Sequence, residues 1–345
     1  MHPNLLRAGA LALSLSFIAI LSWEIHLRHS VKQLAYDDNE ALWADKRARV
    51  YQPGDKATVF IGSSRIKYDL DIPTWRTLTG KDAIQLANVG SSPRAVLKDL
   101  ADDPDFKGNL VVDVTEGLFF SNFGVYNGAT DKKIAYFHHR TPTQRFSFEV
   151  NHVLESQFFF LDQDNFSINA MMDNLPIPPR PDVFPGIYFP IGFTLADYDR
   201  QSIMTPEFVA DTNQQNAVKG VWAYGMSRPF VPLSAGGTDS IFNSVKADVD
   251  KIKARGGQVL FVRTPSDGMY IIRETKYYPK AAYWDRLLAM TGCKGIYYAD
   301  YTATANLHCV EWSHLKPSDA VVYTKALIQE MQEKEWPSKN ISSSQ

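Results

Sequence analysis

Three residues of this chain have the types that nucleophilic acyl transfer needs: Ser64, Glu311 and His314. A serine hydroxyl has a pKa far above 7, so it attacks a carbonyl only when a neighbouring imidazole accepts its proton. The imidazole in turn needs a carboxylate or a carbonyl to fix its tautomer, and Glu311 lies three residues before His314. The sequence therefore predicts Ser64 as the nucleophile, His314 as the base and Glu311 as the group that orients the base.

Two of these assignments have an alternative. Ser64 directly follows a β-rich run, and serine is also a residue type that caps the N-terminus of a helix. His308 lies six residues before His314 and is a competing base. We favour His314 because a Leu-x-Pro turn and a predicted helix follow it.

The elements that must position these residues alternate between strand and helix. Short β-rich runs bounded by small polar turns are typical of buried parallel strands, and the segments between them suit crossover helices. The pattern predicts an α/β fold with a mostly parallel sheet covered by helices on both faces. Ligands bind such sheets at the carboxyl ends of the strands, where Ser64 lies. The predicted strands are 57–61, 83–89, 109–114, 258–262 and 295–298, and the predicted helices are 40–50, 72–78, 94–100, 239–255, 280–290 and 318–334.

The alternation breaks between about 119 and 233, a segment that is rich in aromatic residues and proline and has no internal repeat. Loops this long inside a domain usually carry structure or function of their own. We interpret the segment as an inserted, partly helical cap. A poorly ordered excursion is the alternative, and it would leave many Phe and Tyr side chains in water.

Composition excludes several classes of protein. The chain has 345 residues, 45% of them hydrophobic, which is typical of a globular protein and not of a disordered or fibrous one. Its 36 Lys and Arg against 38 Asp and Glu give a net charge of -2, so no nucleic-acid partner is expected. Two cysteines are too few for a disulfide scaffold.

An apolar run near the N-terminus, 5–23, is just long enough to cross a bilayer as a helix. It contains a single charged residue, Arg7, near its start, and no small-x-small cleavage site follows it. We favour an uncleaved single-pass anchor in the inner membrane over a cleaved signal peptide or a buried core helix. Arg7 and the terminal amine place the N-terminus in the cytoplasm, so the body is expected in the periplasm or outside the cell.

Three segments resemble blocks I, II and V of the SGNH, or GDSL-like, hydrolase superfamily, in the right order: 62–64 (Gly-Ser-Ser), 88–90 (Asn-Val-Gly) and 311–315 (Glu-Trp-Ser-His-Leu). The resemblance covers 57–335 apart from the insertion, and it implies a flavodoxin-like, three-layer α/β/α domain. The chain then divides into an anchor (1–30), a linker with a helix (31–56), the SGNH-like domain with its insertion (57–335) and a C-terminal tail (336–345).

The resemblance also implies roles for single residues. Block I supplies the nucleophile, which maps to Ser64, and block V supplies the base, which maps to His314. The oxyanion hole would be formed by the backbone N–H groups of Ser64 and Gly90. Arg65 is a candidate to bind an anionic substrate, with pairing to a carboxylate as the equal alternative, and Asn88 is either a further substrate-binding candidate or a turn residue.

The chain departs from the family pattern at three places. Ser63 and Glu311 stand where the family usually has Asp, and the third block, 112–116, lacks the Asn that normally completes the oxyanion hole. Loss of one oxyanion donor costs about a hundredfold or more in rate. A catalytically inactive SGNH-like scaffold or polymer-binding partner is therefore the second hypothesis.

An anchor ahead of the Gly-Ser-Ser block, together with a long insertion, is most similar to one membrane-anchored subgroup. This subgroup includes the D-alanyl transfer protein of teichoic acids and the extracytoplasmic proteins of polysaccharide O-acetylation. The resemblance implies an acyl-ester hydrolase or O-acyltransferase that acts on envelope polysaccharide beside a membrane-bound O-acyltransferase.

No metal or other cofactor is expected. The pair His138-His139 invites a metal interpretation, but adjacent side chains point apart in regular structure and no carboxylate pattern accompanies them. The chain also lacks a glycine-rich loop followed by Lys-Ser or Lys-Thr, which argues against phosphoryl transfer.

The cysteines Cys293 and Cys309 are predicted to form a disulfide. They are the only two cysteines, they lie sixteen residues apart, and an extracytoplasmic body meets an oxidising environment. Two separate reduced thiols are the alternative.

Overall fold

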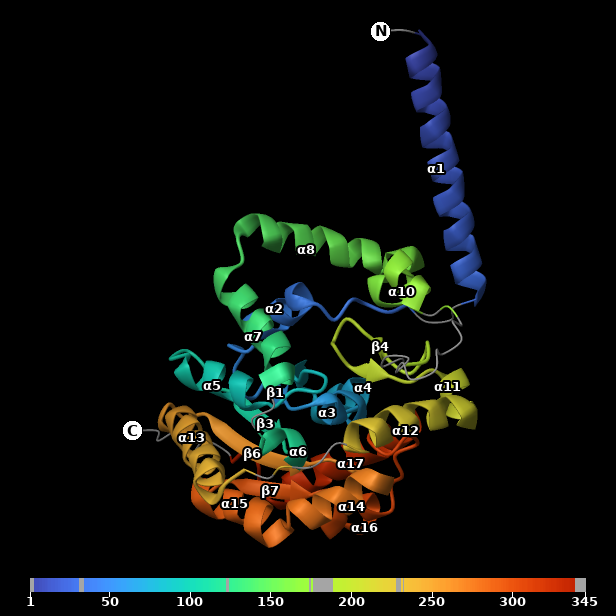
Figure 1. Cartoon of the computed structure of the whole chain (residues 1–345). Coiled ribbons are helices and arrows are strands. Elements are labelled where there is room, and N and C mark those ends of the chain that lie inside the picture. The colour runs from blue at the N-terminus through green and yellow to red at the C-terminus, as the bar shows by residue number, and fades with distance from the viewer. Residues whose placement is uncertain are drawn as a thin grey trace.

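A five-stranded parallel sheet forms the centre of the molecule (Figure 1). The computed structural model describes residues 3–30, 34–121, 124–173, 175, 189–227, 231 and 233–338. The strands lie in the order β2-β1-β3-β6-β7, and every neighbouring pair is parallel. Their bounds are β1 Ala57–Ile61, β2 Asp82–Gln85, β3 Asn109–Asp113, β6 Gln258–Arg263 and β7 Lys294–Tyr297.

Alternate side chains of these strands enter two separate hydrophobic cores, one on each face of the sheet. Val59 and Phe261 belong to one core, and their neighbours Phe60 and Leu260 belong to the other. The first core is covered mainly by α5 (Arg94–Asp102), α13 (Ala235–Ala254) and α15 (Arg286–Thr291), and the second by α3 (Ser64–Asp69), α4 (Ile72–Thr79) and α17 (Pro317–Glu333). The predicted α/β architecture with a mostly parallel sheet is confirmed.

The segment between β3 and α13 is largely helical and contains a small antiparallel strand pair. Two of its helices begin with a threonine cap: Thr141 and Gln144 form a capping box at the start of α8, and the Thr205 side chain caps α11. The elements are α6 Glu116–Phe119, α7 Gly124–His139, α8 Pro142–Glu155, the short helix η1 Phe159–Leu161, α9 Gln163–Phe166, α10 Ile168–Asp173, β4 Leu195–Ala196, β5 Ser202–Ile203, α11 Pro206–Ala210 and α12 Thr212–Ser227.

The remaining elements are the N-terminal helices and short connections. Helix α2 (Glu40–Ala48) is capped by Asn39, whose side chain accepts from two backbone N–H groups. The others are α14 Gly268–Tyr277, the π-helical turn η2 Ala281–Asp285, the short helix η3 Tyr298–Asp300 and α16 Thr302–Ala305.

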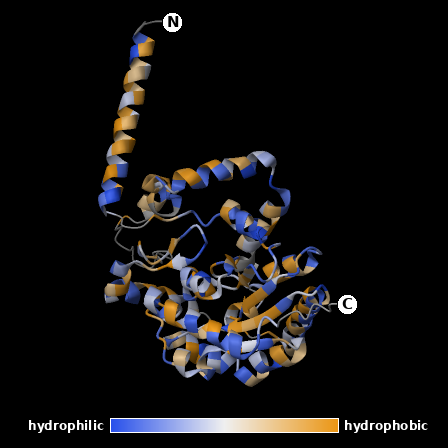
Figure 2. Ribbon diagram, turned by 180° about the vertical axis from the view of Figure 1, so that it is seen from behind, coloured by the Kyte–Doolittle hydropathy of each residue, from blue (hydrophilic) through white to orange (hydrophobic). Residues whose placement is uncertain are grey.

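The N-terminal helix α1 (Pro3–Ser30) projects away from the body (Figure 1), and hydrophobic residues occur along its length (Figure 2). The segment Asn4–Ser30 has a mean hydropathy of 1.9 in its most apolar window, and none of that window is buried. Such a helix is long and apolar enough to cross a membrane. Its exposure is incompatible with the alternative of a buried core helix.

The predicted disulfide is wrong, because Cys293 and Cys309 are both free. Cys293 packs, partly buried, against the core on one face of the sheet, whereas Cys309 is buried in the core on the other face. Burial raises the pKa of both thiols. Spacing along the chain carried no information about which face each cysteine reaches.

Candidate active site

Ser64 is the first residue of α3, directly after the turn that ends β1. The N-cap of this helix is Ser63, whose Oγ accepts from the Arg65 N–H at 3.3 Å. The side chain of Ser64 is thus not needed for capping. The turn is tight: a Cβ on Gly62 would lie 2.6 Å from the side chains of Asp113 and Ile66, so only glycine fits there.

Ser64, His314 and Glu311 form a chain of hydrogen bonds. The Ser64 Oγ lies 2.8 Å from His314 Nε2, and the His314 Nδ1 lies 2.8 Å from Glu311 Oε1. A neutral His314 that donates from Nδ1 to the carboxylate presents an unprotonated Nε2, which can accept the serine proton. The structure brings these three predicted residues together with the spacing of a nucleophile, a base and an orienting carboxylate.

Glu311 is completely buried, and hydrogen-bond donors surround it. Its Oε1 accepts from the backbone N–H groups of Ser313 at 3.3 Å and His314 at 2.7 Å, as well as from the imidazole. Its Oε2 accepts from the Trp222 indole N–H. These donors hold the carboxylate in one orientation and compensate its burial.

The loop that carries Glu311 and His314 is closed by a pairing between Cys309 and Leu315. The Leu315 N–H donates to Asp69 Oδ1 at 3.0 Å, which ties the loop to the end of α3. Trp312, inside the loop, has a φ of 80°, in the left-handed region that a bulky residue rarely adopts. Backbone strain of this kind is common at functional sites and persists only when the surroundings hold it in place.

Aromatic rings surround the imidazole of His314. The Tyr68 ring stacks on it with 4.2 Å between ring centroids, and the rings of Phe193 and Trp222 lie at 5.9 and 6.4 Å. The Tyr68 hydroxyl donates to the Phe193 carbonyl at 3.2 Å and is also hydrogen-bonded to the Thr194 hydroxyl. Burial raises the pKa of Tyr68, so its hydroxyl stays protonated. The rings fix the plane of the imidazole and leave only 2% of His314 exposed.

Sequence reasoning missed Phe193 and Trp222, which come from the inserted segment. The insertion has no helical or strand periodicity that would single out either residue. Their role depends on the tertiary placement of the β4–β5 region and α12 against α3 and the 309–315 loop.

The turn that contains Gly90 lies next to the turn that contains Ser64. The Asn88 N–H donates to the Gly62 carbonyl at 3.2 Å, and the Ser91 N–H closes the turn onto the Asn88 carbonyl at 3.3 Å. Gly90 has a φ of 62°, which favours glycine. The oxyanion role of the Ser64 and Gly90 N–H groups stays a prediction, and the hydrogen bond between the two turns fixes their relative position.

The end of β3 is occupied by hydroxyl and carboxyl groups that bind one another. The Thr115 hydroxyl donates to Asp113 Oδ2 at 3.1 Å, so the Ser63 hydroxyl, 2.6 Å away, must donate to Thr115. Asp113 also accepts from Thr264 at 3.0 Å, and burial raises the pKa of Asp113. This network holds the end of β3 against the serine turn. It contains hydroxyl and carboxyl groups but no amide side chain that could donate to an oxyanion.

Arg65 is buried in an ion-pair network behind the serine. Its guanidinium lies 2.5 Å from Glu274 Oε1, and Arg263 bridges Glu274 and Glu116. Arg65 is only 1% exposed. Of the two roles considered for Arg65, substrate binding and pairing with a carboxylate, the structure shows the pairing, with Glu274.

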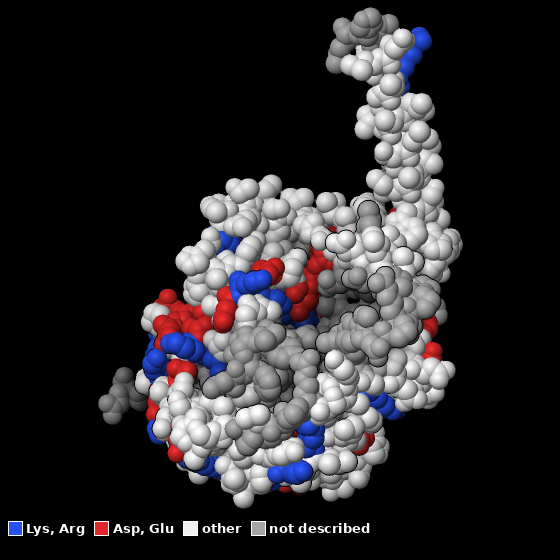
Figure 3. Space-filling view, in the orientation of Figure 1, with Lys and Arg blue, Asp and Glu red and all other residues white. Residues whose placement is uncertain are grey.

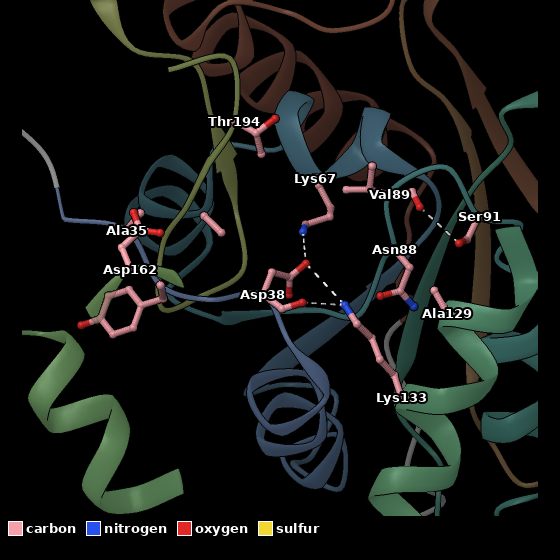
Figure 4. A pocket seen from close by; sticks show the side chains of 12 residues that line it. Ala35, Asp38, Lys67, Asn88, Val89, Ser91, Ala129, Lys133, Asp162 and Thr194 are labelled. Carbon is pink, nitrogen blue, oxygen red and sulfur yellow. Dashed lines mark hydrogen bonds and ion pairs between the residues drawn. The ribbon is translucent and has the colours of Figure 1, made fainter. Parts of the chain in front are cut away.

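A cavity of about 290 Å³ lies beside the turn that contains Asn88 and Gly90 (Figure 4). Lys67 reaches into it and lies 2.5 Å from Asp38, and Lys133 donates to the Asp38 backbone carbonyl at 2.9 Å. Arg200 also pairs with Asp38 at 2.5 Å and donates to Asn88 Oδ1 at 3.1 Å. Although burial opposes it, these cations hold the pKa of Asp38 well below its usual value, whereas burial lowers the pKa of Lys133 to about 7.

Asn88 therefore belongs to the wall of this cavity. It is 4% exposed, and its side-chain nitrogen has no hydrogen-bond partner among the described residues. Ser64 and His314 are not among the residues that line the cavity, so it flanks the serine site rather than containing it.

The remaining histidines singled out in the sequence lie elsewhere. His308 is 82% exposed at its side chain and pairs with Asp267 at 2.9 Å, while His314 is the histidine at Ser64. His138 pairs with Asp99 at 2.6 Å. Within the described part of the chain no group of three or more His, Cys, Asp or Glu residues is arranged to hold a metal ion.

No protein-family model matches this chain, and no curated protein matches it.

Proposed function

We propose that the protein is a membrane-anchored serine esterase or O-acyltransferase of the SGNH type, which acts on envelope polysaccharide through a covalent acyl-enzyme on Ser64. The observation that carries the proposal is the hydrogen-bonded chain Ser64–His314–Glu311, with both links at 2.8 Å. Three side chains from two distant parts of the sequence rarely meet in this order unless they act together.

In the first half of the reaction, His314 Nε2 takes the proton of Ser64 Oγ, and Oγ forms a bond to the acyl carbonyl carbon. The carbonyl oxygen becomes an oxyanion, which the backbone N–H groups of Ser64 and Gly90 stabilise. The intermediate collapses, His314 gives its proton to the leaving group, and the acyl group stays on Ser64.

In the second half, a water molecule or a sugar hydroxyl loses its proton to His314 and attacks the acyl-enzyme. Collapse returns the proton to Ser64 Oγ and releases a carboxylic acid or an acylated sugar. The choice between hydrolysis and transfer depends on how well the aromatic residues and the insertion exclude water from the site.

The architecture supports the family assignment. The strand order β2-β1-β3-β6-β7 corresponds to the flavodoxin-like order 2-1-3-4-5, and Ser64 follows β1 at the switch point of that order. Helix α1 supports a single-pass anchor. We propose that it crosses the inner membrane and that the body lies outside the cytoplasm. A membrane-bound O-acyltransferase is the partner that fits this arrangement.

The end of β3 favours a second candidate, a catalytically inactive scaffold or polymer-binding partner. Thr115 occupies the region where an amide side chain would complete the oxyanion hole, and it is already bound to Ser63 and Asp113.

Labelling with a fluorophosphonate separates the two candidates. We expect covalent modification of the full chain at Ser64, abolished in Ser64→Ala and unchanged in Ser318→Ala, an exposed serine. The absence of label on a folded wild-type chain would support the inactive scaffold.

A further inference from the structure

One face of helix α8 is apolar and exposed. Phe146, Val150, Val153 and Leu154 are 71, 45, 53 and 42% exposed. At 100° per residue these four positions lie within about 100° of one another around the helix axis. The opposite side of α8 carries Phe148, which is buried, so this stripe is not the side that packs on the body.

The apolar surface continues beyond α8 toward the foot of α1. Further large apolar side chains are exposed on the segment that follows, on α10 and just after it. We call these residues together the α8–α10 face: Phe146, Val150, Val153, Leu154, Phe158, Met171, Met172 and Leu175. Figure 3 shows few Lys, Arg, Asp or Glu atoms along the top of the body, over α8.

The α8–α10 face is fixed to the membrane-spanning candidate by polar contacts. Glu24 in α1 accepts from the backbone N–H groups of Phe159 and Phe160 at 3.3 and 3.1 Å. Arg28, also in α1, donates to the Gln157 carbonyl at 2.5 Å and pairs with Glu24 at 2.8 Å. The last turns of α1 are therefore held against the segment that links α8 to α10.

The contacts begin where the apolar part of α1 ends. Trp23 closes the uncharged run, and tryptophan is enriched at the boundary between membrane and water. Glu24 is the next residue and Arg28 lies one helical turn later, so the hydrogen bonds between α1 and the body start at that boundary. Helix α8 runs crosswise to α1 in Figures 1 and 2, as a helix lying along a membrane surface would.

We propose that the α8–α10 face lies in the lipid interface on the side of the bilayer that holds the body, with Phe146 and its neighbours inserted below the headgroups. The inference rests on the part of the proposed function in which α1 crosses the membrane. The occupant is phospholipid because the face is continuous with a helix whose own surroundings are acyl chains. Arg145 and Glu149 flank the stripe on α8 and can reach the headgroups.

This contact would fix the orientation of the body. A single helix allows the domain to tilt and rotate, whereas a second contact along α8 restricts both motions. The serine site would then be held at a constant height above the membrane, which suits a partner enzyme that is itself embedded there.

Photochemical labelling by lipid tests the proposal on the full chain. The protein is reconstituted in nanodiscs of phosphatidylcholine and phosphatidylglycerol that contain a phosphatidylcholine with a diazirine in its acyl chain. After irradiation and digestion, we expect lipid adducts on α1 and on peptides from 146–158. Ile272 in α14 is the matched control, because it is 67% exposed but lies in the part of the body remote from α1 (Figure 1). Labelling of α8 should exceed that of α14 by about tenfold or more.

A double variant, Phe146→Ser with Val153→Ser, should lower labelling of the remaining α8–α10 face severalfold, while Ile272→Ser changes nothing. Both residues are exposed, so folding is retained. Adducts on α1 with none on α8 would overturn the inference and leave the anchor intact, and the face would then be assigned to a protein partner. Absence of adducts on α1 as well would overturn the anchor itself.

Discussion

The sheet and the inserted segment contribute different things to the candidate site. Ser64 follows a strand of the sheet, and Glu311 and His314 lie on the loop before α17, so the atoms that would react belong to the α/β part. Trp222 and Phe193, which hold the glutamate and the imidazole in place, belong to the insertion. The residues that would react thus belong to the regular α/β part, whereas residues that position them belong to the irregular insertion.

The two regions also bury charge differently. Behind the sheet end, two arginines and two glutamates form one chain of ion pairs, in the order Arg65, Glu274, Arg263 and Glu116. In the insertion, the turn between β4 and β5 contains Arg200, whose guanidinium pairs with Asp38 of the linker. The same carboxylate also pairs with Lys67 and Lys133, so three cations share one anion. The comparison indicates that cations outnumber carboxylates around Asp38, whereas the two are balanced behind the sheet end. Apolar packing of Phe193 against Tyr68 also holds the insertion to the body.

The largest expected effect is on the α/β part. Ser64→Ala and His314→Ala should each lower hydrolysis of p-nitrophenyl acetate by about 10⁴-fold or more, because members of a catalytic unit fail together. His308→Ala, the matched control, should retain activity. Folding is checked by circular dichroism. A reversed result for the two histidines would move the base to His308.

Glu311→Gln is expected to cost about 10²- to 10⁴-fold in kcat, since an amide in place of the carboxylate favours the wrong tautomer of His314. KM should change little, because Glu311 is buried behind the imidazole and is not expected to touch substrate. An effect as small as that of an exposed substitution would show that Glu311 does not orient the base.

The sequence predicted the α/β part well because its signals are local. The β-rich runs 57–61, 109–114 and 258–262 correspond to β1, β3 and β6 within one residue at each end. Since a polar turn after a buried strand can only lie at the sheet end, Ser64 could be placed without knowing the rest of the fold. The predicted strand 83–89 is longer than the observed strand β2, which ends at Gln85. Beyond that point Leu86 and Asn88 still donate to the Phe60 and Gly62 carbonyls, while Arg200 binds the outward-facing carbonyls of Gln85 and Ala87.

The sequence predicted less where contacts join distant segments. Arg65 meets Glu274, which is 209 residues away, and no pattern links the two. The predicted helix 280–290 begins as the π-helical turn η2 and becomes α-helical only at Arg286. Trp222 donates to Glu311 because of the way the insertion folds, and no helical or strand periodicity in the insertion predicted that contact. Packing, rather than local propensity, decides all three.

Trp222→Phe tests the contribution of the insertion with a smaller expected effect. It removes the N–H that binds Glu311 Oε2 and keeps an aromatic ring beside His314. A buried carboxylate oxygen without a donor costs about 1–3 kcal/mol of folding free energy. Because Glu311 is then held less firmly and orients His314 less well, kcat should fall by roughly tenfold. Trp222→Ala should lose more, because it also removes the ring. Unchanged kcat in both variants would show that the insertion does not position the triad.

The smallest expected effect concerns the charges of the β4–β5 turn. Burial raises the pKa of Asp197 to about 6, while the unfolded chain keeps the ordinary value of 3.8. Between these two values the folded state binds a proton that the unfolded state has lost, so stability falls as pH rises from about 4 to 6 and is constant above. Relative to Asp197→Asn, the wild type should therefore lose on the order of 2 kcal/mol of unfolding free energy across this window.

Asp103 is the matched control, because its pKa is shifted in the opposite direction and it does not interact with Asp197. Although burial opposes it, the hydrogen bond from Arg47 holds the pKa of Asp103 below its usual value. Both states have then lost this proton above about pH 4, so the difference between wild type and Asp103→Asn should not change with pH from 5 to 6. Urea denaturation at a series of pH values measures both differences. Parallel curves for the wild type and Asp197→Asn would mean that Asp197 is ionised in the fold and that the turn is held without a buried neutral carboxyl.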